Sequence, residues 1–139
     1  MLLPDTTLDE ALERNYDMVA LPGGMPGMTN LRNDPRIIAL LQKMAAAGKY
    51  TCAICAAPMV LAEAGLLGDK RATSYPGFLD KLNLPNVTYL NDAVVVDDEI
   101  ITSRGPGTAM DFALQLIETL LGKAKRNEVE IGLQRSKCC

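Results

Sequence analysis

Short apolar runs alternate with helix-like segments along most of this chain of 139 residues. Two of them, DMVAL at residues 17–21 and YTCAI at residues 50–54, have the length and composition of buried strands. Between them, Asp34 and Pro35 form a helix start signal, and Gly48 forms a stop signal. Apolar strands separated by helices pack as a parallel sheet with helices on both faces. The sequence therefore predicts an α/β fold.

The rest of the chain continues this pattern. Its size allows about two-thirds of the unfolded surface to be buried, so we expect a single domain over residues 1–139. We expect a short capped helix in LDEALER at residues 8–14 and further helices over residues 58–64, 108–121 and 124–134. Short β-rich pieces are expected over residues 71–74, 87–90, 93–96 and 99–102, and a hairpin turn at Asp97-Asp98 joins the last two.

Composition excludes several classes of function. The chain has no histidine, which excludes an internal Ser-His-Asp or Cys-His arrangement and any histidine-containing zinc site. The net charge is −3 and tryptophan is absent, so we expect no nucleic-acid partner. The longest apolar run, residues 52–62, is interrupted by Pro58 and is too short to span a membrane. We also expect no cofactor, since no phosphate-binding loop motif is present, and no metal, since histidine is absent.

The four cysteines lie in two near-adjacent pairs, at positions 52 and 55 and at positions 138 and 139. Such spacing makes a poor disulfide framework, and no basic flank or apolar segment typical of a signal peptide begins the chain. We therefore expect a reducing, cytoplasmic location. For Cys138 and Cys139, a double-cysteine prenylation end is one interpretation, and a solvated tail with oxidisable thiols is the one we favour.

Cys55 stands at the corner between a predicted strand and the helix that follows. Small residues two positions away on each side, Ala53 and Ala57, suit the tight turn of a nucleophile elbow. A helix N-terminus there would stabilise a thiolate, and backbone N–H groups could hold an oxyanion. The alternative interpretation is an inert core cysteine. A dithiol or metal site with Cys52 is disfavoured, because Cys52 lies within the strand and should point into the core.

Two turn-rich segments follow predicted strands and would reach the same edge of the sheet. The loop LPGGMPG at residues 21–27 lets backbone N–H groups approach a ligand, although it could also be a plain tight turn. The segment SRGPGT at residues 103–108 opens a long helix, and its Arg104 could bind an anion or pair with a carboxylate.

Together, the segments LPGGMPG, AICAAP, SYP and TSRGPGTAMDFAL resemble the ThiJ/PfpI superfamily, in the branch of YajL and the parkinsonism-associated protein deglycase. The resemblance runs from about Tyr16 to Gly122 and implies a flavodoxin-like three-layer sandwich. By position, Cys55 matches the family nucleophile, and Gly24 and Ala56 match the residues whose amides form the oxyanion pocket. Tyr75 falls where some members carry a histidine, and Arg104 lies in a segment that packs near the site.

The resemblance also implies a departure from the family at the N-terminus. Family members have a first strand-helix unit ahead of the segment that matches Met1, and that unit carries a glutamate that helps to activate the cysteine. We therefore expect the domain to be N-terminally incomplete, with Met1 an internal methionine of a longer protein. The resemblance further implies a homodimer in complete relatives, which often form one, partly through the same unit.

The function implied by the resemblance is a cysteine-dependent enzyme acting on reactive carbonyls, of the glyoxalase III or protein deglycase type. Its substrate would be a small aldehyde or an early glycated adduct, which forms a hemithioacetal at Cys55. The alternative is a non-enzymatic oxidative-stress sensor or redox-regulated chaperone that acts through oxidation of Cys55. A cysteine peptidase is disfavoured because the chain supplies no histidine.

Overall fold

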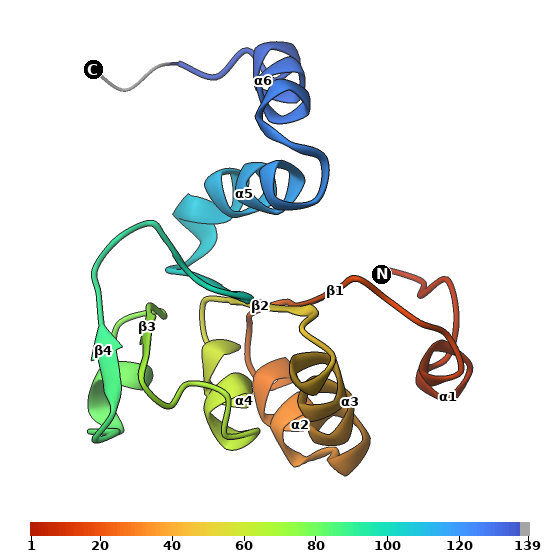
Figure 1. The fold of residues 1–139 in the computed structure, drawn as a ribbon, viewed down its shortest axis with the longest axis vertical. Helices are drawn as coiled ribbons and strands as arrows, with labels where there is room; N and C mark the ends of the chain where they lie inside the picture. The colour runs from red at the N-terminus through yellow and green to blue at the C-terminus, as the bar shows by residue number, and fades with distance from the viewer. Residues whose placement is uncertain (137–139) are drawn as a thin grey trace.

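A computed structural model describes residues 1–136 of the protein as helices flanking a four-stranded sheet (Figure 1). The sheet has the order β1-β2-β6-β5, in which β2 runs parallel to β1 and β6, and β5 is antiparallel to β6. Its strands are β1 (Met18–Leu21), β2 (Tyr50–Ile54), β5 (Val94–Asp97) and β6 (Ile100–Ser103). Two further strands, β3 (Lys70–Ala72) and β4 (Val87–Tyr89), pair in parallel as a separate sheet.

Helices cover both faces of the main sheet. Figure 1 shows α2, α3 and α4 on one face and α5 on the other, with α6 beyond α5 and α1 beside β1. The helices are α1 (Leu8–Leu12), α2 (Gly27–Asn33), α3 (Pro35–Ala46), α4 (Pro58–Glu63), α5 (Ala109–Leu121) and α6 (Lys123–Gly132), with short 3₁₀ turns η1 (Leu79–Lys81) and η2 (Pro106–Thr108). This arrangement confirms the predicted α/β fold with a mostly parallel sheet. No helix within residues 1–136 is long and apolar enough to cross a membrane.

Each face of the sheet has its own apolar core. The larger core lies between the sheet and α2, α3 and α4, and Leu41, Val60 and Leu61 are fully buried in it. On the opposite face, the buried side chains of Cys52, Ile101 and Phe112 pack together. Cys52 therefore points into the core, as its place within a strand predicts.

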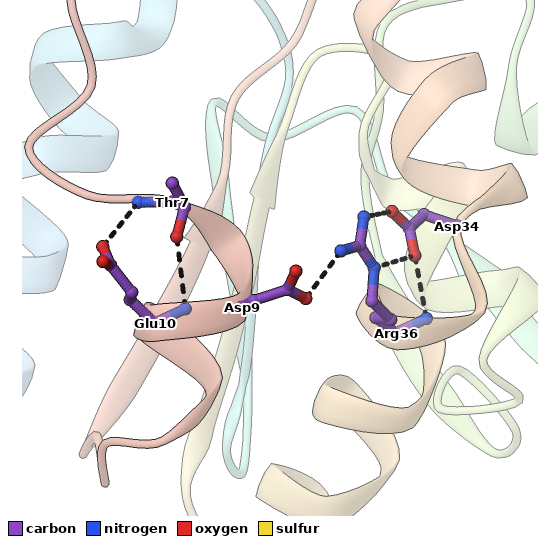
Figure 2. A network of polar contacts seen from close by, with 5 residues as sticks. All are labelled: Thr7, Asp9, Glu10, Asp34 and Arg36. Atoms are coloured by element: carbon purple, nitrogen blue, oxygen red, sulfur yellow. Dashed lines mark hydrogen bonds and ion pairs between the residues drawn. The ribbon is translucent and has the colours of Figure 1, made fainter.

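An ion-pair network fastens α1 to the start of α3 (Figure 2). Asp34 caps α3 by accepting a hydrogen bond from the Arg36 amide, and its carboxylate also binds the Arg36 guanidinium at 2.7 Å. The same guanidinium reaches Asp9 of α1 at 2.8 Å. Hydrogen bonds from Arg36 hold the pKa of Asp34 below its usual value. α1 has its own capping box between Thr7 and Glu10, so both helix starts follow from their sequence signals.

Three features differ from the sequence predictions. The run DMVAL was expected to form a buried strand, but β1 is an edge strand in which only Leu21 is buried and Ala20 is exposed. α2 was not predicted, because its sequence GMTNLRN begins after a proline and has a weak apolar pattern. The hairpin turn was predicted at Asp97-Asp98 but lies at Asp98-Glu99, because Asp97 is the last residue of β5 and pairs with Ile100. The edge position of β1 and the pairing of β3 with β4, for which no partners were predicted, depend on non-local packing. The terminal pair Cys138-Cys139 lies outside the described residues.

Candidate active site around Cys55

Cys55 lies at the corner where β2 leaves the sheet and turns toward α4. Its φ of 66° is in the left-handed region, which costs a non-glycine residue about 1–3 kcal/mol and persists only where the surroundings enforce it. Here its amide donates to the carbonyl oxygen of Ser103 at 3.0 Å, and its carbonyl oxygen accepts from the amide of Tyr75 at 2.8 Å. Neighbouring segments thus hold the backbone of Cys55 on both sides.

The position of Cys55 relative to α4 differs from the prediction. The helix begins at Pro58 with Ala57 as its N-cap, so Cys55 precedes the helix by three residues rather than standing in its first turn. A tight turn closed by the hydrogen bond from the Ala57 amide to the Ile54 carbonyl oxygen separates them. The place of Cys55 is therefore set by this turn and by the neighbouring loops rather than by the first turn of α4.

The two cysteines of the C-x-x-C segment have different surroundings. Both are free thiols, and Cys52 is fully buried whereas Cys55 is partly exposed. Burial raises the pKa of Cys52 to about 12, against a smaller opposing effect of a backbone hydrogen bond with Ile101. Cys52 therefore stays protonated and unreactive in the folded protein, which disfavours a dithiol pair.

The glycine loop after β1 reaches the Cys55 corner through Gly23. A β-carbon built on Gly23 would lie 2.6 Å from Cβ of Cys55, 3.0 Å from the carbonyl oxygen of Ile54 and 3.3 Å from Sγ of Cys55. The next residue, Gly24, has a φ of 97°, which favours glycine. The loop containing Gly24 is thus in van der Waals contact with the thiol-bearing residue.

The amides of Gly24 and Ala56 are the predicted oxyanion donors. Ala56 is buried and follows Cys55 directly, and Gly24 is exposed in the loop beside it. Within residues 1–136, neither amide is engaged by a backbone carbonyl oxygen.

Tyr75 joins this cluster through its backbone and its ring. Besides the hydrogen bond from its amide to Cys55, its ring packs against Gly105, where a β-carbon would lie 3.2 Å from Cδ2 of the tyrosine. The ring also makes an edge contact with Phe78 at a centroid distance of 6.3 Å. The residue is 47% exposed, so part of it is accessible to solvent.

Arg104 is directed toward the loop before β5 and not toward a carboxylate. Its Nη1 donates to the backbone and side-chain oxygens of Asn91, at 3.0 and 3.1 Å. The neighbouring hydroxyl of Ser103 donates to Ala93 at 2.8 Å and lies 2.7 Å from that of Thr108. These contacts fix the turn that carries the Ser103 carbonyl oxygen, so the segment supports the site through its backbone.

Residues 1–119 match the DJ-1/PfpI family. The chain belongs to this family. It is 40% identical over 129 residues to Protein DJ-1 homolog A of Arabidopsis thaliana, covering 92% of this chain and 33% of the relative. It is 39% identical over 128 residues to the glutathione-independent glyoxalase DJR-1.2 of Caenorhabditis elegans, covering 92% of this chain and 68% of that protein.

The fold of this DJ-1/PfpI chain is also similar to solved structures of the family. The crystal structure of Drosophila melanogaster DJ-1beta matches with a TM-score of 0.91 and 42% sequence identity, covering 97% of this chain and 73% of the fly protein. The chain thus spans a third of the length of the plant relative and about three quarters of the fly structure.

Two residues of the site in this family member were not identified from the sequence. Gly23 approaches Cys55 more closely than the predicted Gly24, and the glycine-rich loop was the only signal that could have pointed to it. Ser103 contributes a backbone carbonyl oxygen to the Cys55 amide. Because any residue type supplies such an oxygen, no sequence pattern marks it.

Proposed function

We propose that this chain is a cysteine-dependent enzyme of the glyoxalase or deglycase type, with Cys55 as the nucleophile. The observation that carries the proposal is a partly exposed thiol on a strained corner, next to two amides that no backbone oxygen of residues 1–136 engages. Similarity to a C. elegans protein named as a glutathione-independent glyoxalase supports the choice of a small reactive carbonyl as substrate.

The proposed reaction begins with addition of the Cys55 thiolate to the aldehyde carbon of methylglyoxal. A carbon–sulfur bond forms, the carbonyl π electrons move to oxygen, and protonation of that oxygen gives a hemithioacetal. The amides of Gly24 and Ala56 would stabilise the developing negative charge. Transfer of the C1 proton to C2, with movement of the C1 hydroxyl proton to the C2 oxygen, then gives a lactoyl thioester, and water releases lactate and the thiol. C1 is oxidised and C2 reduced, so no external oxidant is needed.

Proton transfer from C1 to C2 needs a positioned acid–base group, which typically contributes 10²–10⁴-fold to such a step. Addition of the thiolate to the aldehyde does not require that group. Hemithioacetal formation and lactate turnover are therefore separate readouts of the proposal.

Methylglyoxal consumption and lactate formation test the proposal. The chain is compared with Cys55→Ala and with Cys52→Ala, which removes the buried thiol from the same strand. Loss of lactate formation in Cys55→Ala alone is the expected result. Lactate formation at the same rate in Cys55→Ala and the unmodified chain would rule out the cysteine mechanism.

A second candidate function is an oxidative-stress sensor that responds through Cys55. The observation in its favour is the contrast in exposure between the two described cysteines, since an oxidant can reach Cys55 but not Cys52. Mass spectrometry after mild peroxide treatment distinguishes the two functions. Oxidation of Cys55 to sulfinic acid without any carbonyl turnover favours the sensor. Homodimer formation and chaperone activity remain predictions from the resemblance, and a cytoplasmic location remains a prediction from the cysteine spacing.

A further inference from the structure

We propose that Gly23 is a positioning residue, which sets the distance between the Cys55 thiol and the Gly24 amide. The proposal rests on the proposed function of Cys55, because the amide is useful only if an oxygen atom develops charge beside the thiol. Gly23 acts here only because it has no side chain, which lets the loop backbone lie close to Cys55.

The contact at Gly23 leaves no room for a side chain. The atoms nearest to a β-carbon placed on this residue would be Cβ of Cys55 at 2.6 Å and the carbonyl oxygen of Ile54 at 3.0 Å. Neither is the end of a flexible side chain, so neither can turn away by a change of rotamer. A methyl group at Gly23 must therefore displace a segment of backbone.

The segment that would move is the glycine loop and not the Cys55 corner. The corner is held by backbone hydrogen bonds to Ser103 and Tyr75, and Ile54 lies in the interior strand β2. The loop, in contrast, borders a mainly apolar cavity of about 440 Å³, whose lining includes Pro22, Gly23 and Gly27 but not Cys55. A larger residue at Gly23 would push the loop toward this cavity.

Displacement of the loop would carry the Gly24 amide away from the thiol. An oxyanion donor acts at about 2.7–3.1 Å from the oxygen it stabilises, and misplacement by about 1 Å can reduce a rate by 10²-fold. Gly23→Ala is therefore expected to reduce kcat about 10²-fold, with a smaller change in KM. Alkylation of Cys55 by iodoacetamide develops no oxyanion, so its rate is expected to stay within about threefold of the unmodified chain.

Gly27→Ala is the matched control. Gly27 is the first residue of α2, directly after the same loop, has no positive φ, and has open space where a β-carbon would be placed. This variant is expected to retain both the turnover and the alkylation rate. Turnover by Gly23→Ala equal to that of Gly27→Ala would overturn the proposal, as would an equal loss of alkylation and turnover in Gly23→Ala.

A measurement on the unmodified chain tests the same placement without requiring Gly23→Ala to fold. The ¹H–¹⁵N resonances of Gly24 and Gly27 are followed by NMR while Cys55 is converted to its methylglyoxal adduct or is alkylated. The proposal predicts a shift of the Gly24 resonance and none of Gly27. An unchanged Gly24 resonance would overturn the positioning role. Absence of lactate formation with a shifted Gly24 resonance would instead count against the proposed function alone.

Discussion

The buried hydroxyl of Thr102 in β6 is expected to stabilise the segment that leads to Tyr75. Its Oγ1 accepts a hydrogen bond from the Thr73 amide at 2.9 Å, and both residues are fully buried. Thr102→Val keeps the shape of the side chain and removes the acceptor. The Thr73 amide would then be left in the core without a partner.

The expected loss follows from this single orphaned donor. An unsatisfied buried donor costs about 1–3 kcal/mol, which corresponds to a roughly 5- to 150-fold change in the folding equilibrium. Urea unfolding followed by circular dichroism measures this difference as a shift of the midpoint at unchanged slope. Because the segment also supplies the Tyr75 amide that binds Cys55, the same hydrogen bond supports the site.

Thr51→Val is the matched control for this prediction. Thr51 is equally buried on the neighbouring strand β2, but its hydroxyl oxygen has no hydrogen-bond partner within the described residues. Replacing it should leave stability unchanged or increase it, because an unpaired polar atom is removed from the core. Equal stability of Thr102→Val and the unmodified chain, or an equal loss in Thr51→Val, would refute the reasoning.

Three further results are expected. Iodoacetamide at mildly alkaline pH should modify Cys55 and spare Cys52, whose pKa burial raises to about 12; labelling of Cys52 in folded protein, detected by peptide mapping, would contradict this. Asp34→Asn should lower the Tm at neutral pH. Arg36 lowers the pKa of Asp34 in the folded state. The stabilisation by the charged Asp34 is therefore present above the pKa of this residue in the unfolded chain and is lost as the pH falls through its lower pKa in the folded protein. The Tm values of Asp34→Asn and the unmodified chain should thus converge in acid, and a Tm difference that stays constant with pH would argue against the pairing. Leu41→Ala should destabilise by about 2–5 kcal/mol in urea, because the side chain is fully buried, and a loss below about 1 kcal/mol would show that the core collapses around it.

Local signals were sufficient to predict much of the fold. Asp34 and Pro35 start α3, and Gly48 follows its end. The antiparallel hairpin of β5 and β6 forms as predicted, with its turn at Asp98-Glu99, one residue later than the predicted Asp97-Asp98. Each of these features depends on residues within one turn of one another. The edge position of β1 could not be predicted in this way, because an apolar run looks the same whether one or two strands pair with it.

The candidate site was predictable only in part, for the same reason. Cys55 could be placed on a corner because small residues flank it in the sequence. The hydrogen bonds that Cys55 makes with Ser103 and Tyr75 involve backbone atoms of residues that are distant in the chain. The close approach of Gly23 likewise depends on how β1 and β2 pair. Residue types in a sequence do not indicate contacts of backbone atoms, or close approaches that depend on the lack of a side chain.

Direct observation of the adduct tests the central claim that Cys55 attacks the aldehyde. Methylglyoxal labelled with ¹³C at its aldehyde carbon is added to the chain carrying Cys138→Ser and Cys139→Ser, so that the terminal thiols cannot react. We predict one NMR resonance of a saturated carbon bonded to oxygen and sulfur, which is retained in Cys52→Ala and absent from Cys55→Ala. The same resonance at equal intensity in Cys55→Ala would contradict the account.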